Sequence, residues 1–181
     1  MYCFLSASLP ELIPGAPPPL TVEEFDEMCR AELSEERFAA LTAFDGTVTP
    51  DFTGNAELPG IYNTFGRFEL YMRNRIARRR AEKAGEQLEL PDPPEYFNDY
   101  DAAAGAIAAA DPSEREEMLD KLRRDFIDEQ LLCKEFSFTA LCAYRLKLLI
   151  ANKYRYRKPE PGQQNFDAAL ERLSPNNPRK E

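Results

Sequence analysis

A long basic helix is the sequence feature that most constrains how this chain folds. Residues 61–85 carry seven Arg or Lys and two Glu, a net charge of +5, whereas the whole 181-residue chain carries −9. Gly85 stands where a helix commonly ends on a glycine. Apolar side chains recur every three or four positions, which is the spacing of one helix face, at Ile61, Phe65, Phe68, Met72 and Ile76. The segment therefore predicts a helix over 61–84 with one buried face and cations on others.

Residues that typically cap the N-terminus of a helix predict several further helices. Thr21 and Glu24 form a capping box, and Ser34 precedes two glutamates that suit a first helical turn. Asp111 followed by Pro112 predicts the start of a helix that runs to about residue 132. Residues 138–156 are apolar on nearly every side as far as Ala151, so we expect this helix at the centre. Short helices are also expected over 101–110 and 165–173, and residues 1–9 fit either a helix or an extended segment.

These elements predict an all-α, single-domain bundle of about six or seven helices over residues 1–181. Turn-forming residues predict a loop at 45–60, and three prolines predict a linker at 86–98. Residues 174–181 are expected to fray. In the helix that follows Thr21, we expect Phe25, Met28 and Cys29 to face the core.

The composition narrows the classes of function. The chain has no histidine, which excludes histidine-based catalysis and zinc or di-iron sites that use histidine. It has neither a Walker loop nor a Gly-x-Gly-x-x-Gly motif, and no cysteine pair has zinc-knuckle spacing. Its net charge of −9 disfavours nucleic acid as the main partner. We therefore predict a non-enzyme without cofactor or metal, with reduced thiols.

The apolar stretch at 138–151 is shorter than the ~20 residues that span a bilayer, and Arg145 and Lys147 interrupt it. The sequence thus predicts a cytoplasmic protein without direct membrane insertion. Attachment to a membrane complex remains compatible with this prediction.

Three weaker motifs each have a structural and a functional interpretation. Asp45-Gly46-Thr47 matches the end of a phosphatase motif, but Ala43 occupies the nucleophile position, so we interpret it as a turn. Aromatic and cationic residues alternate over 154–158, as in some RNA-binding proteins, but cations are expected at a helix C-terminus anyway. A row of carboxylates could bind a hard cation, although a solvated face paired with nearby cations is the favoured interpretation: Glu116, Glu117, Asp120, Asp125, Asp128 and Glu129.

Five arginines in the basic helix are the best candidates for a partner-binding surface. They are Arg73, Arg75, Arg78, Arg79 and Arg80. Arg75 and Arg79 share one helix face, and Arg73 and Arg80 share another. One set has the spacing to pair with the acidic 112–132 helix, and the other to meet an acidic partner, for which the planar guanidinium is well suited.

Several stretches, in this order, resemble a bacterial family of uncharacterised proteins encoded beside genes for V/A-type ATPase subunits. The stretches are residues 1–10 (MYCFLSASLP), 71–78 (YMRNRIAR), 111–116 (DPSERE), 119–129 (LDKLRRDFIDE) and 140–148 (ALCAYRLKL). The first two are also faintly similar to the C (d) subunit of rotary ATPases, a helical funnel that seats the central stalk on the rotor ring.

The resemblance implies a non-catalytic subunit of a V/A-type rotary ATPase, a central-stalk or rotor adaptor whose partners are stalk or rotor subunits. In that role the arginines at 73–80 would contact acidic surfaces of the complex. Two alternatives stay open. One is a soluble assembly or regulatory factor that binds the ATPase transiently, and the other is a free-standing helical protein-interaction module.

Overall fold

The computed structural model describes residues 2–93 and 97–156. These residues form seven α-helices and one 3₁₀ helix and contain no strand, which confirms the all-α prediction. The helices are α1 (Cys3–Ser8), α2 (Val22–Glu32), α3 (Glu35–Thr42), α4 (Gly60–Ala84), η1 (Asn98–Tyr100), α5 (Asp101–Ala109), α6 (Pro112–Glu129) and α7 (Phe138–Tyr156). The helix expected at 165–173 and the tail at 174–181 lie outside the described residues.

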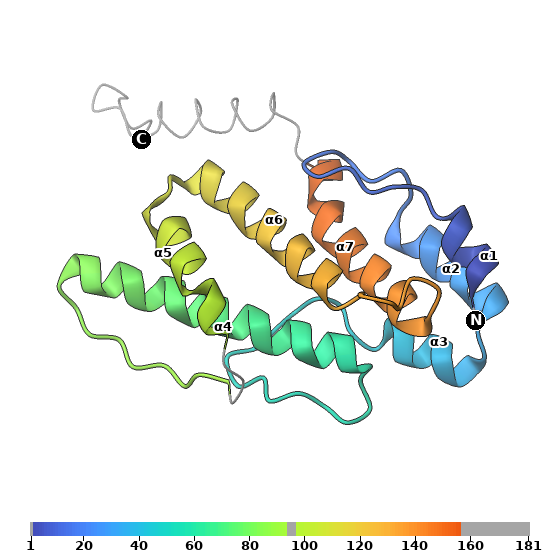
Figure 1. Ribbon diagram of the computed structural model, residues 1–181, viewed down its shortest axis with the longest axis horizontal. Helices are drawn as coiled ribbons and strands as arrows, with labels where there is room; N and C mark the ends of the chain where they lie inside the picture. The colour runs from blue at the N-terminus through green and yellow to red at the C-terminus, as the bar shows by residue number, and fades with distance from the viewer. Residues whose placement is uncertain (1, 94–96, 157–181) are drawn as a thin grey trace, which may run out of the picture.

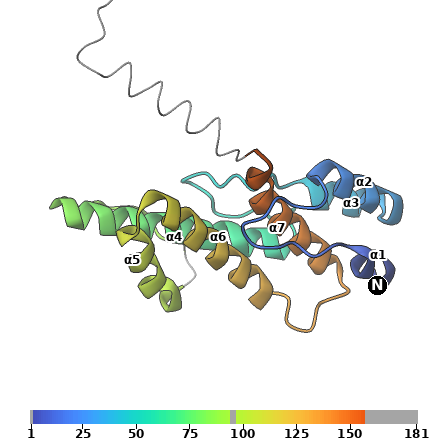
Figure 2. The same ribbon diagram turned by 90° about the horizontal axis from the view of Figure 1, so that it is seen from above.

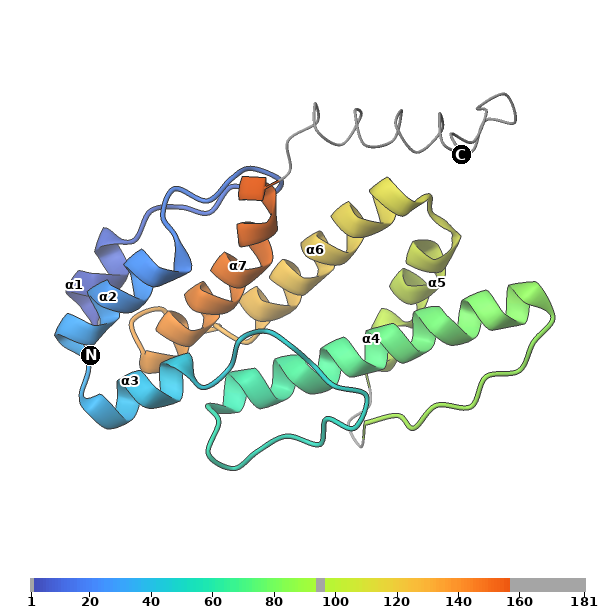
Figure 3. The same ribbon diagram turned by 180° about the vertical axis from the view of Figure 1, so that it is seen from behind.

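Helix α7 lies at the centre of the arrangement, as its sequence predicts. Figures 1 and 3 show it between a group formed by α1, α2 and α3 and a second group formed by α4, α5 and α6. It contacts α2, α4 and α6. From Phe138 to Ala151 no residue of α7 is fully exposed, because neighbours cover the helix on all sides.

Local signals fix several helix ends where the sequence places them. Thr21 and Glu24 form a reciprocal capping box, and the Ser34 side chain accepts a hydrogen bond from the backbone of Arg37. Gly85 ends α4 with a φ of 77°, a left-handed conformation that glycine adopts without a Cβ penalty. The Asp111 carboxylate accepts a hydrogen bond from the backbone N–H of Glu114, at 2.9 Å.

The proline-rich connector between α1 and α2 is tied to the core by side chains. The hydroxyl of Tyr144 donates to the carbonyl of Pro10 at 2.9 Å, and Arg155 donates to the carbonyl of Pro18 at 2.9 Å. Arg124 donates in the same way to Leu12. Proline lacks a backbone donor, so the connector is held through its carbonyl oxygens rather than through a backbone ladder.

Helix α4 is buried on more than the one face that its periodicity predicts. The five expected residues are all buried, and so are Tyr62, Gly66, Leu70, Tyr71 and Asn74. The ring of Phe52, in the loop before α4, lies so close that a Cβ on Gly66 would be 2.3 Å from its Cε1 atom. Helices α5, α6 and α7 cover the other sides, so a partly polar helix occupies a core position.

The structure corrects three details of the sequence prediction. Met28 is 37% exposed rather than inward, because α2 buries the face that carries Val22, Phe25 and Cys29. Helix α6 ends at Glu129 and gives way to turns before reaching residue 132. The expected linker at 86–98 is irregular over 86–93, but its last residue already belongs to η1.

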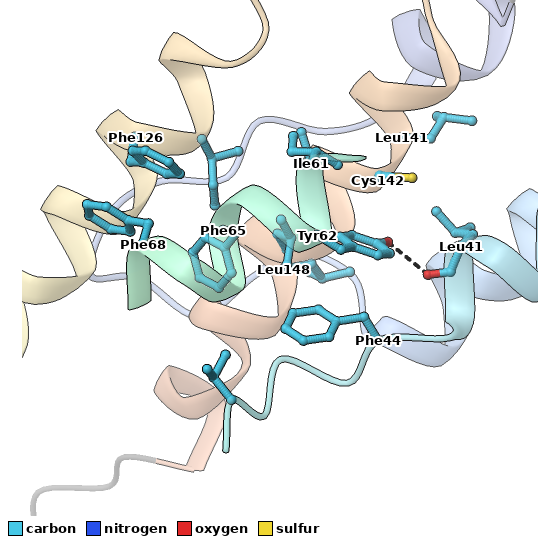
Figure 4. Packing of buried hydrophobic residues seen from close by; sticks show 14 of the residues in the cluster. Leu41, Phe44, Ile61, Tyr62, Phe65, Phe68, Phe126, Leu141, Cys142 and Leu148 are labelled. Atoms are coloured by element: carbon cyan, nitrogen blue, oxygen red, sulfur yellow. Dashed lines mark hydrogen bonds between the residues drawn. The ribbon is translucent and has the colours of Figure 1, made fainter. Parts of the chain in front are cut away.

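All seven α-helices contribute to one cluster of buried apolar side chains. Near its middle, Tyr62 is fully buried and its hydroxyl donates a 2.8 Å hydrogen bond to the carbonyl of Leu41, which ties α4 to α3 (Figure 4). The ring of Phe44 packs on Tyr62 with ring centroids 5.3 Å apart. Among the described residues, no helix combines the length and hydropathy needed to cross a membrane.

Candidate functional site

The five predicted arginines do not form one uniform surface. Arg75 and Arg78 pair within the protein. The Nε atom of Arg75 makes an ion pair 3.2 Å from Asp101 Oδ1, without the alignment of a hydrogen bond, and its guanidinium lies over the Tyr71 ring. Arg78 donates to both carboxylate oxygens of Asp92, at 3.0 and 2.8 Å. These two arginines therefore hold the segments around α4 together.

Arg73 and Arg80 instead line a groove between α4 and α6. The groove has a volume of about 330 Å³, and Arg115 and Arg123 of α6 also line it. Arg73 is exposed and donates to the carbonyl of Val48 at 2.6 Å. Among the residues that the structure describes, Arg80 has no hydrogen-bond or ion-pair partner. The spacing of seven residues predicts that Arg73 and Arg80 share one face of the helix. The structure places both in one groove, together with two arginines of α6.

The groove has an excess of positive charge that the protein fixes in place. It is lined by four arginines and two glutamates, Glu69 and Glu116. Burial alone would lower the pKa of Arg123, but ion pairs with Glu69 and Asp120 raise it above its usual value. The same pairs offset the charge of Arg123, so the excess comes from the other three arginines. Arg115 donates to the carbonyls of Ile107 and Ala110 at the end of α5. Carbonyls neutralise no charge, so Arg115 keeps a full cation beside the groove.

The C-terminal end of α4 extends beyond the neighbouring helices. Figures 1 and 2 show this end at one extreme of the molecule, past α5. Arg79, Arg80 and Lys83 are exposed there, and the partner of Arg79 among the described residues is Glu82, at 3.4 Å. An exposed pair of this kind contributes about 0–1 kcal/mol. The tip of α4 therefore remains cationic toward solvent.

One interpretation of the sequence paired some of the five candidate arginines with the acidic residues of α6, but the structure shows no such pair among the described residues. In the part of the chain that the structure describes, the partners of these five arginines lie on α5, on the loops around α4 or on α4 itself. Three of the α6 carboxylates, Glu116, Asp120 and Asp128, pair with lysines of α7 instead. Asp120 is 4% exposed and accepts hydrogen bonds from Arg123, from Lys153 and from Tyr154.

Glu116, Asp128 and Glu129 also have structural contacts, whereas Glu117 and Asp125 are exposed. Glu116 pairs with Lys153 at 2.8 Å, and this hydrogen bond holds the pKa of Glu116 below its usual value. Asp128 pairs with Lys147, and Glu129 accepts from Tyr100. Within the described residues, no cluster of three or more potential ligands is placed to hold a metal ion.

Two further motifs have local structural roles. Asp45 Oδ1 accepts a 2.8 Å hydrogen bond from the backbone of Thr47, and Gly46 has a φ of 88°, so this motif forms a turn. Tyr154 and Arg155, from the alternating aromatic and cationic segment, contact Asp120 and the carbonyl of Pro18. Residues 157 and 158 of that segment lie outside the described residues.

The four cysteines are free thiols, of which Cys3 and Cys133 are exposed while Cys29 and Cys142 are buried. Burial raises the pKa of both buried thiols to about 12. The thiolate is the reactive form, so both burial and protonation protect these two groups.

We therefore expect iodoacetamide to alkylate Cys3 and Cys133 in the folded protein at pH 8, and to leave Cys29 and Cys142 unmodified. Peptide mass spectrometry after timed quenching measures the extent at each site. Denatured protein, in which all four thiols react, is the control. Rapid alkylation of Cys29 or Cys142 in the folded protein would contradict the packing of α2 against α7.

Sequence reasoning missed Arg115 and Arg123 as members of the cationic groove. Both are on the helix that its composition marks as acidic, and their local spacing carries no sign that they meet α4. The hydrogen bond from Arg123 to Glu69 joins residues 54 positions apart. Only the packing of α6 on α4 brings these groups together.

No family model, no curated protein and no solved structure matches this chain. The resemblance to the ATPase-associated family stays a prediction. The groove between α4 and α6 is the site where four of the described arginines gather.

Proposed function

We propose that this protein is a non-catalytic helical adaptor that binds an acidic surface of a V/A-type rotary ATPase through the groove between α4 and α6. The observation that carries the proposal is the gathering of Arg73, Arg80, Arg115 and Arg123 around one groove in a chain of net charge −9. The rotary ATPase as partner is supported by the sequence resemblance and not by the geometry.

The charge distribution favours a protein partner with carboxylates at the contact. The cationic groove attracts an acidic patch on the partner, while the acidic remainder of this protein repels the partner's other acidic surfaces. The charge distribution therefore orients the partner as well as attracting it. Arg80 offers a guanidinium without a partner in the described residues. Such a group is able to bind a carboxylate through two parallel hydrogen bonds.

The proposal separates the five candidate arginines by role. Arg73 and Arg80 contact the partner, whereas Arg79 lies outside the groove at the exposed tip of α4. Arg75 and Arg78 maintain the fold through Asp101 and Asp92.

The test is purification of the tagged protein from its native host in a gentle detergent, with stoichiometry by mass spectrometry. We expect stalk or rotor subunits of the ATPase at near one copy per complex. Replacing Arg73 and Arg80 together with Glu should reduce this recovery at least about tenfold, since opposed like charges disfavour the contact.

The matched control is a variant with Arg79 and Lys83 both replaced by Glu, which changes the net charge equally but outside the groove. It should retain most of the recovery. Equal loss in both double variants would indicate general charge attraction instead of the groove. ATPase subunits at low stoichiometry would favour a transient assembly or regulatory factor. A clean preparation without ATPase subunits would reject the ATPase and leave a free-standing interaction module.

A further inference from the structure

A second, larger cleft lies on the other side of α6, away from the α4–α6 groove. It has a volume of about 630 Å³ and is bounded by Ser6 of α1, by residues 9–14 of the connector, and by α6 and α7. Its walls are partly apolar, with Leu9, Pro10, Leu12 and Pro14 from the connector. Cavities of this size suit small organic molecules.

Arg124 lines this cleft and differs from Arg145, an equally buried arginine. Each is 6% exposed. Arg145 donates from Nε and Nη2 to the two carboxylate oxygens of Asp26, at 2.8 and 3.1 Å. Arg124 donates only from Nη1 to the carbonyl of Leu12, at 3.0 Å, and within residues 2–93 and 97–156 no carboxylate pairs with it. Its buried Nη2 atom has no hydrogen-bond partner in the described part of the chain.

A buried guanidinium without a counter-anion is unfavourable, and so is a buried donor without an acceptor. Ser6 provides a second case in the same cleft, since its buried hydroxyl also has no hydrogen-bond partner among the described residues. Two residues that line one cleft, Ser6 of α1 and Arg124 of α6, thus carry donors without a partner among the described residues, which indicates a ligand that supplies acceptor oxygens.

The charges around the cleft limit the ligand to a small negative charge. The lining residues include three cations, Lys121, Arg124 and Lys147, and three anions, Glu11, Asp125 and Asp128. Lys147 and Asp128 neutralise each other as an ion pair. A dianion such as phosphate would face Glu11 and Asp125 with only two remaining cations, whereas a single carboxylate needs only Arg124.

We propose that this cleft binds a small organic monocarboxylate with an apolar body. Arg124 and Ser6 bind the carboxylate, and the apolar part lies against the leucines and prolines of the connector. The site is independent of the proposed ATPase contact, because it shares no lining residue with the α4–α6 groove.

The experiment uses the full chain and the probes hexanoate and benzoate, with hexanamide, benzamide and inorganic phosphate as comparisons. Binding is measured by thermal shift and by isothermal titration calorimetry, at up to about 10 mM probe. We expect at least one carboxylate to raise Tm by about 3–6 °C at ten times its Kd. The amides and phosphate should raise Tm by less than about 1 °C.

Arg124→Gln keeps a donor for the Leu12 carbonyl but removes the cation, and it should weaken carboxylate binding at least about tenfold. Lys121→Gln, an exposed cation of the same cleft, is the matched control and should leave the Kd within about twofold. If Arg124→Gln does not fold, Ser6→Ala provides the second test, with an expected loss of about fivefold.

Several results would overturn the proposal. These are no binding of either carboxylate, equal binding by Arg124→Gln, an unchanged Kd in Ser6→Ala, or stabilisation by phosphate or the amides as large as that by the carboxylates. A dipeptide such as acetyl-Ala-Leu offers the same carboxylate on a peptide. Tighter binding of that dipeptide than of both small acids would overturn the assignment to a small acid.

Discussion

Replacing Phe68 with Ala should lower the free energy of unfolding by about 3–5 kcal/mol, the usual cost of removing a fully buried phenyl ring. Phe68 is 1% exposed on α4 and stacks on Phe126 of α6, with ring centroids 3.9 Å apart and an angle of 6° between the rings. Phe97 and Tyr100 contact it edge-on, at 5.8 and 5.0 Å. The ring therefore joins α4, α6 and the segment leading into α5, and a cavity there loosens all three.

Urea unfolding followed by circular dichroism measures this change, provided that the dependence on urea concentration is the same in both proteins. Phe4→Ala is the matched control, because Phe4 is 86% exposed and its loss should change stability by no more than about 0.5 kcal/mol. A loss below about 1.5 kcal/mol for Phe68→Ala would contradict a tightly packed aromatic cluster at this position.

Replacing Asp120 with Ala should be as costly, at about 3–5 kcal/mol, because it removes one member of a buried charge network. Asp120 accepts from Arg123 at 3.1 Å, from Lys153 at 2.8 Å and from Tyr154 at 2.6 Å. Its loss leaves the Tyr154 hydroxyl without this acceptor and reduces the negative charge beside two cations. The contact between α6 and α7 should weaken in consequence.

Asp125→Ala is the control for this prediction, since Asp125 is an exposed acid on the same helix and should contribute about 0.5 kcal/mol or less. A double-mutant cycle with Lys153→Met measures the pair directly, and we expect a coupling energy of about 0.5–3 kcal/mol. Equal stability of the Asp120→Ala and Asp125→Ala variants would show that the network adds nothing to the fold.

The sequence alone determined most of the helices, because their signals act over three or four residues, but it left open whether residues 1–9 form a helix, and α1 (Cys3–Ser8) does. Thr21 with Glu24, Ser34, Asp111 with Pro112, and Gly85 each mark a helix end through contacts with their own first or last turn. The periodicity of apolar residues likewise identified a buried face of α4 and the central place of α7. These features depend on neighbours along the chain, which the sequence displays directly.

Tertiary structure alone decided the roles of the charged residues. Arg78 pairs with Asp92 fourteen positions away, Arg123 with Glu69 at fifty-four positions and Arg145 with Asp26 at one hundred and nineteen. Such pairs depend on which helices pack together, and helix periodicity leaves that choice open. For the same reason the sequence showed five similar arginines on α4, whereas packing pairs two of them with carboxylates outside α4, places two in a groove and leaves Arg79 beside Glu82 of its own helix. Packing likewise leaves Arg124 of α6 buried without a counter-anion among the described residues.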